Sequence, residues 1–129
     1  MASFVLDTHA ALWWWRDSPL LGVNAVRAIS ASANEIFVSV TSALEVAIKY
    51  RIGKLDDIGD PAINYPRLMK LHGFQNIPVL ETHAMTAGLL AGEHRDPFDR
   101  LIAAQALTMG ATIITRDPAF AAFGCKVIW

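Results

Sequence analysis

The chain has 129 residues, the size of one ordinary domain, and we expect a single domain over residues 1–129. Eleven Lys and Arg residues against twelve Asp and Glu residues give a formal net charge of −1, which argues against nucleic-acid binding mainly through a basic face. Hydrophobic residues make up 53% of the chain, which excludes intrinsic disorder and exceeds what a small core readily buries. This excess predicts a permanent partner surface.

Cysteine content and terminal patterning bear on the cellular compartment. Cys125 is the single cysteine, which excludes a disulfide framework and a cysteine-rich zinc site and fits a reducing cytoplasm. The N-terminal stretch has no basic region and carries Asp7 and His9 within its apolar run, unlike an export signal. The longest uncharged run, between Arg100 and Arg116, is too short to span a bilayer. We expect a cytoplasmic protein that does not bind membranes.

Short apolar segments alternate with helical patterns. In chain order, we expect a strand at 4–6, helices at 10–16 and 19–33, a strand at 36–40, helices at 42–52 and 61–72, a strand at 77–80, helices at 82–90 and 98–109, a strand at 112–114, a short helix from 118 and a strand at 126–128. The expected N-caps of four of these helices are Thr8, Ser18, Thr41 and Thr82. This order predicts an α/β fold with a mostly parallel central sheet of about five short strands, flanked by helices on both faces.

Five acids fall just after a predicted strand or at the start of a helix near one. Asp7 follows the first strand, Glu45 lies one turn into the helix after the second, and Asp117 follows the fourth. Asp96 and Asp99 open the helix that leads into the fourth strand. Since parallel strands place their carboxyl ends along one edge of a sheet, these acids should converge there.

Carboxylates gathered at one edge repel one another unless a divalent cation lies among them. Oxygen ligands without cysteine, and without an obligatory histidine, favour Mg²⁺ or Mn²⁺ over zinc. A carboxylate-held cation with open coordination positions is typical of phosphodiester chemistry. His9 could approach such a site or form a hydrogen bond at the start of its helix, and His94 could contact a phosphate or be a solvated loop residue.

Each acid also has an explanation that needs no metal. Asp96 and Asp117 precede prolines and suit helix N-caps, and Asp99 is favoured by the helix dipole. Glu45 could form an ion pair within its own helix. Asp7 is the hardest to explain in this way, because an acid that ends a buried strand is costly without a partner.

Three consecutive tryptophans, Trp13, Trp14 and Trp15, lie in the first predicted helix. Consecutive helical positions point in different directions, so all three cannot enter one core. A division between the core and a dimer or partner interface is the leading interpretation, and a platform for stacking RNA bases is the alternative.

Several segments match the motifs of one family in order and cover nearly the whole chain. They are Leu-Asp-Thr-His-Ala at 6–10 with Trp-Trp at 13–14, Ser-Val-Thr-Ser at 39–42 before Glu45, Arg-Asp-Pro-Phe-Asp-Arg-Leu-Ile-Ala-Ala-Gln-Ala at 95–106, and Thr-Arg-Asp at 115–117. On these segments the chain resembles PIN-domain ribonucleases, specifically VapC-type toxins of bacterial toxin–antitoxin pairs. The resemblance implies a PIN fold, a homodimer, a cognate antitoxin, and Mg²⁺- or Mn²⁺-dependent endonucleolytic cleavage of RNA.

The resemblance also implies roles for individual residues. Asp7, Glu45 and Asp99 fall on the three main acids of the family, Asp117 falls on a fourth, more variable acid, and Asp96 is a further acid of this subgroup. The first three would hold one ion, and Asp117 or Asp96 would serve a second ion or the attacking water. The candidate RNA contacts are Thr8, Arg95, Arg100, Thr115 and Arg116.

Three alternatives use similar residues. A haloacid-dehalogenase-like phosphatase needs a second Asp two residues after the strand-end acid, where this chain has His9. A phospho-receiver domain needs paired early acids and a Lys after a late strand, and neither occurs. A catalytically silent PIN-like module that binds RNA or a protein partner is the non-enzymatic alternative. Setting the five site acids aside leaves seven acids against eleven basic residues, a mildly basic remainder that is compatible with RNA.

Overall fold

A computed structural model describes residues 2–129, which contain one five-stranded sheet. The strands are β1 (Ser3–Leu6), β2 (Glu35–Ser39), β3 (Gln75–Ile77), β4 (Thr112–Ile114) and β5 (Val127–Ile128). Neighbouring strands pair in the order β3-β2-β1-β4-β5, and each pairing is parallel. The predicted α/β fold with a mostly parallel sheet is confirmed.

Seven helices connect the strands within residues 2–129. They are α1 (Thr8–Trp15), α2 (Val23–Ser30), α3 (Val40–Arg51), α4 (Pro61–Leu71), α5 (Glu81–Leu89), α6 (Pro97–Met109) and α7 (Pro118–Ala122). None of the helices in this range is long and apolar enough to cross a membrane.

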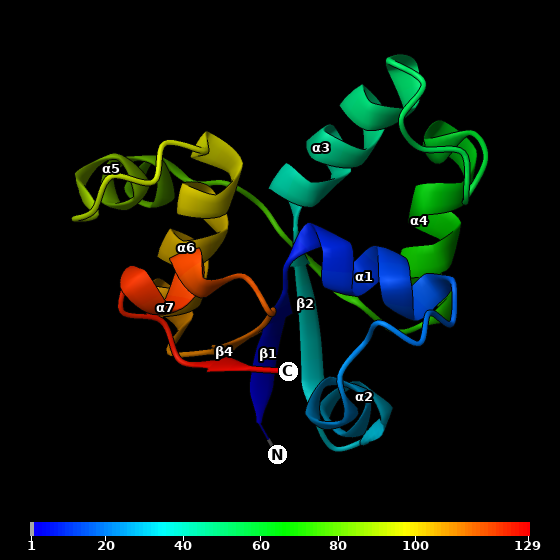
Figure 1. The fold of residues 1–129 in the computed structure, drawn as a ribbon, viewed down its shortest axis with the longest axis horizontal. Coiled ribbons are helices and arrows are strands. Elements are labelled where there is room, and N and C mark those ends of the chain that lie inside the picture. Colours follow the sequence, from blue (N-terminus) through cyan, green and yellow to red (C-terminus); the bar gives the residue numbers. More distant parts are fainter. Residues whose placement is uncertain (1) are drawn as a thin grey trace.

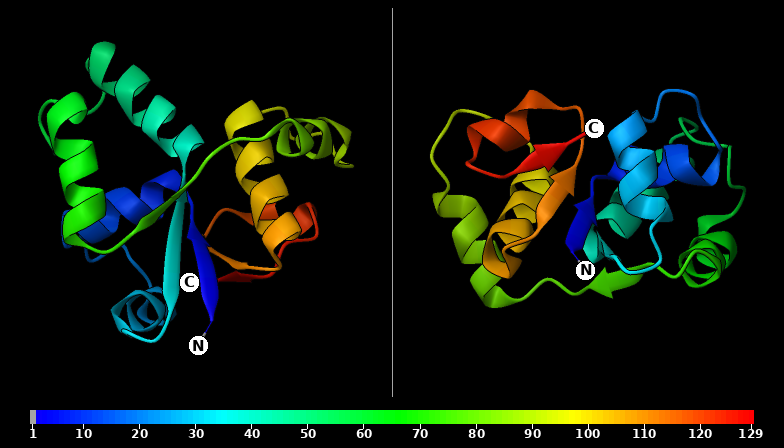
Figure 2. Two further views of the ribbon diagram at one scale, coloured as in Figure 1. Left: turned by 180° about the vertical axis from the view of Figure 1, so that it is seen from behind. Right: turned by 90° about the horizontal axis from the view of Figure 1, so that it is seen from below.

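Alternate residues of the strands enter two hydrophobic cores on opposite faces of the sheet, as the two-residue period of a strand requires. Leu6, Val38 and Ile114 pack with α1 to α4, whereas Val5 and Ile113 pack with α6 and α7. Figure 1 shows α1, α2 and α4 on one side of β1 and β2 and α5, α6 and α7 on the other, and the reverse view in Figure 2 agrees. The sheet therefore lies between two helical layers.

The strand register brings chemistry-bearing residues to one edge. Leu6 of β1 pairs with Val38 of β2 and with Ile114 of β4, so β1 and β4 end at the same level and β2 ends one residue later. Asp7 and Thr115 follow two of these ends directly, and the Asp7 N–H donates to the Ile114 carbonyl at 3.2 Å. The carboxyl edge of the central strands is where the site forms.

Three predicted N-caps are wrong by one or two residues. Asp7 caps α1 in place of Thr8, and Ser39 caps α3 in place of Thr41. In both cases the capping residue has an extended backbone at the end of a strand, and its side chain accepts the capping hydrogen bond. The Thr8 hydroxyl is therefore free for other contacts. Helix α5 begins one residue before the expected cap Thr82.

The segment between α1 and α2 forms a turn where the sequence predicted a helix from Pro19. Ser18 Oγ accepts from the backbone N–H two residues later at 3.2 Å and stabilises this turn, and α2 begins only at Val23. Gly22 caps α2, and a Cβ atom on Gly22 would lie 2.4 Å from the main-chain carbonyl carbon of Trp129. Glycine therefore lets the last residue of the chain approach the start of α2.

Strand β3 also differs from its prediction at 77–80. It pairs with β2 over Gln75–Ile77 and stops before Pro78. Proline has no N–H to donate, so it cannot continue the ladder.

Candidate functional site

Asp7 is buried at the end of β1, with 8% of its surface exposed. Its Oδ1 accepts from the Ala10 N–H at 2.7 Å, and its Oδ2 accepts from the Thr115 hydroxyl. Burial raises the pKa of Asp7, those two hydrogen bonds partly offset the rise, and the charge of Asp117 adds to it. A cation close to this buried carboxylate would stabilise its charged form and so lower its pKa.

Thr115 links two of the acids. Its hydroxyl donates to Asp7 and accepts from the Asp117 N–H at 3.0 Å. Asp117 in turn caps α7 by accepting from the Ala119 N–H at 2.9 Å. The resemblance implied that Thr115 contacts RNA. In the structure Thr115 is buried, and its hydroxyl orients these two acids.

Glu45 reaches the same edge from α3. The Thr8 hydroxyl donates to Glu45 Oε1 at 2.7 Å, and Lys49 Nζ lies 3.1 Å from Glu45 Oε2. Thr8 also hydrogen-bonds to the Ser42 hydroxyl at 2.9 Å. The anticipated ion pair of Glu45 within its helix exists, but one carboxylate oxygen faces α1. Thr8, also expected to contact RNA, is buried and positions Glu45.

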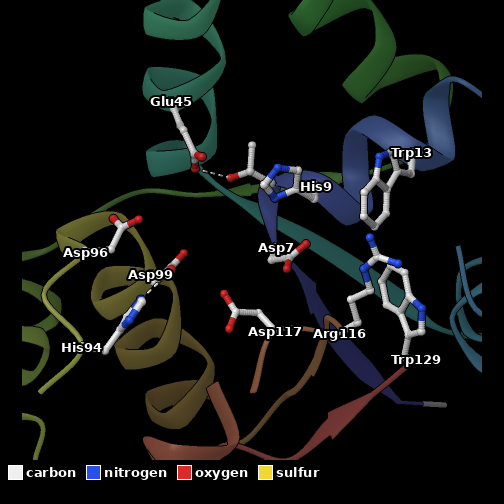
Figure 3. A pocket seen from close by; sticks show the side chains of 11 residues that line it. Asp7, His9, Trp13, Glu45, His94, Asp96, Asp99, Arg116, Asp117 and Trp129 are labelled. Atoms are coloured by element: carbon white, nitrogen blue, oxygen red, sulfur yellow. Dashed lines mark hydrogen bonds and ion pairs between the residues drawn. The ribbon is translucent and has the colours of Figure 1, made fainter. Parts of the chain in front are cut away.

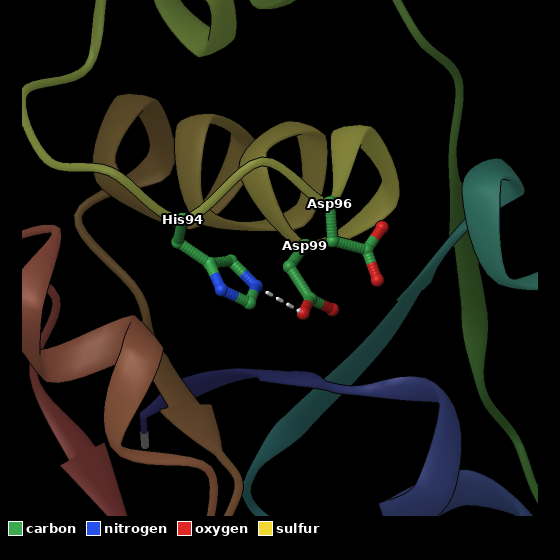
Figure 4. Close-up of side chains that lie close together, drawn as sticks. All are labelled: His94, Asp96 and Asp99. Carbon is green, nitrogen blue, oxygen red and sulfur yellow. Dashed lines mark hydrogen bonds and ion pairs between the residues drawn. The ribbon is translucent and has the colours of Figure 1, made fainter.

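Asp96 and Asp99 lie at the start of α6 beside His94 (Figure 4). Asp96 caps the helix by accepting from the Phe98 N–H at 2.9 Å, and His94 Nε2 hydrogen-bonds to Asp99 Oδ2 at 2.8 Å. One ligand atom from each of the three residues lies within 4.8 Å of the others. Burial raises the pKa of Asp99, the His94 hydrogen bond opposes the rise, and the nearby acids Asp96 and Asp117 increase it.

One pocket of about 530 Å³ joins all five acids (Figure 3). The five come from four places in the fold: the end of β1, the second turn of α3, the start of α6 and the start of α7. The residues that line the pocket are Asp7, Thr8, His9, Trp13, Glu45, His94, Asp96, Asp99, Arg116, Asp117 and Trp129. The predicted convergence of these carboxylates is thus present in the fold.

The three candidate arginines have different surroundings. Arg100 donates to the backbone carbonyls of Ala87, Leu90 and His94, so its guanidinium ties the 87–94 segment to α6. Arg95 is exposed and lines a neighbouring hollow outside the acidic pocket. Arg116 lines the acidic pocket itself. The hydrogen bonds to backbone carbonyls give Arg100 a structural role that does not depend on RNA binding.

Comparison with known proteins agrees with this geometry. Residues 4–124 match the PIN domain family. The chain belongs to the PIN domain family. This PIN domain is 29% identical over 118 residues to a protein named Ribonuclease VapC22 from Mycobacterium tuberculosis, a match that covers 91% of this chain and 88% of that protein.

Solved structures share the fold of this PIN domain. VapBC2 from Rickettsia felis, crystallised with a DNA fragment from its promoter, has a chain that aligns with a TM-score of 0.69 at 19% identity, covering 98% of this chain and 97% of that one. FitAcB from Neisseria gonorrhoeae aligns with a TM-score of 0.69 at 21% identity, covering 98% and 96% of the two chains.

The acids of this PIN domain fit a hard divalent cation. The converging donors are carboxylate oxygens, which Mg²⁺ and Mn²⁺ prefer, and Asp7 and Asp99 carry raised pKa values in the absence of a cation. Within residues 2–129, His94, Asp96 and Asp99 form the one group of three possible ligands whose atoms lie within 4.8 Å of one another, and Asp7 and Glu45 line the same pocket. Asp96 and Asp117 lie close enough to Asp99 to raise its pKa, which makes them candidates for a second ion or a water.

Four pocket residues of the PIN domain are absent from the predicted site residues. His9 and His94 were considered without being assigned to the site, and Trp13 and Trp129 were not assigned to it at all. Trp129 lies at the far end of the chain and reaches the pocket only because β5 pairs beside β4 and Gly22 leaves room. Trp13 belongs to the tryptophan run, whose division the sequence anticipated without assigning a member to the site. No local sequence signal identifies Trp129.

Proposed function

We propose that residues 1–129 form a single PIN domain that acts as a Mg²⁺- or Mn²⁺-dependent endoribonuclease, the toxin of a toxin–antitoxin pair in the cytoplasm. The convergence of Asp7, Glu45, Asp96, Asp99 and Asp117 in one pocket carries this proposal. The relative named Ribonuclease VapC22 supports the ribonuclease activity. A divalent ion among such acids lowers the pKa of a bound water and polarises a phosphodiester.

The chain's own residues prepare the site in two ways. Thr8 and Lys49 hold the two carboxylate oxygens of Glu45, and Thr115 aligns Asp7 with Asp117. These contacts orient Glu45, Asp7 and Asp117 before a cation is bound. Arg116 places a cationic group at the pocket wall, where it can meet charge that develops on a phosphate.

Cleavage of single-stranded RNA by the purified protein tests the nuclease. We expect cleavage in Mg²⁺ or Mn²⁺, its loss in EDTA, and its loss in Asp7→Asn and Asp99→Asn. Asp56→Asn is the matched control, because Asp56 is exposed outside the pocket and loses the same charge. Cleavage by Asp7→Asn and Asp99→Asn at the wild-type rate contradicts the mechanism. A protein that binds RNA but does not cut it in any metal is the catalytically silent module instead.

An antitoxin and a second copy of the chain are the partners we propose. Solved structures of similar fold include a toxin–antitoxin complex from Klebsiella pneumoniae and VapBC-1 from Haemophilus influenzae. Several apolar side chains are exposed, among them Met85 at 64% and Leu89 at 83% on α5, which supports self-association there. We expect a dimer by light scattering and a monomer for Leu89→Glu. A monomeric wild-type protein contradicts the dimer.

A further inference from the structure

Trp13, Arg116 and Trp129 form the side of the pocket that faces Asp96 and Asp99 (Figure 3). We call these three residues the aromatic wall. The Trp13 and Trp129 rings meet edge to face, with centroids 5.6 Å apart, and the Arg116 guanidinium lies 4.6 Å from the Trp13 ring centroid. Trp129 packs against the core that α1 to α4 share, but Trp13 and Arg116 do not. Neither of these two supplies a carboxylate to the proposed metal site, so their place in the pocket needs another explanation.

Packing of the core does not explain Trp13. Its neighbours in sequence, Trp14 and Trp15, pack against the core that α1 shares with α4, and Trp14 Nε1 donates to His72 Nδ1 at 3.1 Å. Trp13 is not among the residues packed on that core and instead lines the pocket, half-buried. A large aromatic surface beside acids suggests a ligand with an aromatic face.

Arg116 differs sharply from Arg100. The guanidinium of Arg100 is occupied by three backbone carbonyls, whereas that of Arg116 makes no hydrogen bond or ion pair with residues 2–129. Stacking on Trp13 holds the group in place while its N–H donors remain available. An exposed, stacked guanidinium of this kind suits a planar or anionic ligand.

We propose that the aromatic wall is a nucleobase subsite, on which one base of a single-stranded RNA stacks beside the nucleotide whose phosphate reaches the acids. This inference rests on the proposed ribonuclease function and specifies its substrate. A base must leave its neighbours to stack on protein aromatics, which single strands allow and a duplex resists. The wall therefore selects unpaired RNA without selecting a particular base.

Binding of a labelled oligouridylate tests the subsite. Measured by fluorescence anisotropy in Ca²⁺, which neutralises the acids, the Kd of Trp13→Leu should be about tenfold higher than that of the wild type, the loss expected for one stacked base. Arg116→Gln should also bind more weakly. Trp14→Phe is the control, since Trp14 packs against the core and lies outside the wall, and should bind like the wild type. A duplex of the same length should bind the wild type, Trp13→Leu and Trp14→Phe alike.

Defined outcomes overturn the proposal. The proposal is contradicted if Trp13→Leu and Arg116→Gln both bind the oligouridylate within twofold of the wild-type affinity. It is also contradicted if the wild-type protein does not bind the oligomer. If Trp13→Leu does not fold, Arg116→Gln decides by comparing the two RNAs, because Arg116 is exposed and its substitution should not unfold the protein. A stacking role weakens binding of the single strand more than binding of the duplex, and equal weakening of both contradicts the subsite. Unchanged RNA binding with loss of a protein partner assigns the wall to that partner and also overturns the subsite.

Kinetics in Mg²⁺ separate this subsite from the proposed function. Absence of metal-dependent cleavage by the wild-type protein refutes the nuclease, whatever the oligomer affinity. If the wild type cleaves, Trp13→Leu should raise KM for the oligouridylate with a smaller change in kcat, because the stacked base lies beside the reacting phosphate. Unchanged KM in a cleaving protein refutes the subsite alone.

Discussion

Thr8 and Glu45 are 37 residues apart in the chain, yet the Thr8 hydroxyl donates a 2.7 Å hydrogen bond to Glu45 Oε1. Lys49 lies 3.1 Å from the other carboxylate oxygen, so the acid is held from both sides. Glu45 lies on α3, which begins directly after β2, and this contact ties α3 to α1 at the pocket.

Substitution of Thr8 by Val keeps the side-chain shape and removes the hydroxyl. Glu45 then loses one of its two positioning contacts, and we expect metal affinity to fall by roughly 10- to 100-fold, as for other residues that orient a metal ligand. A Mg²⁺ titration of cleavage, together with metal-dependent thermal stabilisation, measures the change. Thr8→Ser should restore both quantities. A Val variant with wild-type metal affinity would show that Lys49 suffices.

Asp99 should destabilise the metal-free protein at neutral pH. Its folded pKa is raised by burial above the ordinary value of 3.8, so the folded state retains a proton that the unfolded state has released. The contribution of Asp99 to the free energy of unfolding therefore falls as the pH rises from 3.8 through the folded pKa. Asp7 acts in the same direction.

The variant Asp99→Asn isolates this effect. In EDTA it should melt at a higher temperature than the wild type at neutral pH, by roughly 2–5 °C for a stability gain of about 1 kcal/mol. The difference should vanish only below pH 3.8, where the carboxyl is protonated in both the folded and the unfolded state. Asp56→Asn, with the same change of charge, should show no such pH dependence. Equal melting temperatures of Asp99→Asn and wild type across this range would contradict the burial penalty.

Arg100→Lys should weaken the fold. Lysine cannot reproduce the three hydrogen bonds that the guanidinium gives to the carbonyls of Ala87, Leu90 and His94. We expect a loss of about 2 kcal/mol in the free energy of unfolding, measured by urea denaturation. Arg95→Lys, at an exposed position nearby, is the control and should be neutral. If Arg100→Lys is equally neutral, these carbonyls are satisfied in another way.

Gly22→Ala should displace Trp129 from the pocket, although none of the residues that line the pocket is substituted. The backbone of Gly22 has φ −67°, which alanine adopts freely, but the added methyl group would lie 2.4 Å from the Trp129 main chain. We expect lower stability and a changed near-ultraviolet circular dichroism spectrum, since Trp13 and Trp129 rings are in contact. Gly88→Ala is the control, because a Cβ there meets nothing within 4 Å. A wild-type spectrum for Gly22→Ala would contradict the close approach.

The positions of the acids relative to strands were predictable because they depend on local patterns. A short apolar run identifies a strand, and the residue after it must lie at the carboxyl edge of a parallel sheet. Asp7 and Asp117 follow from that rule. The support given by Thr8 and Thr115 was not predictable, since it requires knowing that α1 meets α3 and that β1 pairs with β4.

The errors share a physical cause in tertiary context. Thr8 and Thr41 are good caps by type, but Asp7 and Ser39 precede them, and the end of strand pairing decides where each helix begins. The tasks of Arg100 and Trp129 depend on contacts with distant segments, which no periodicity in the sequence encodes.

Three of the five pocket acids, Asp7, Asp96 and Asp117, are also helix N-caps. A descendant of this chain that no longer cut RNA would still be selected to keep them, because loss of a cap costs about 1 kcal/mol. Glu45 and Asp99 cap no helix. Those two residues are therefore the ones whose loss would distinguish an inactive descendant from a working nuclease.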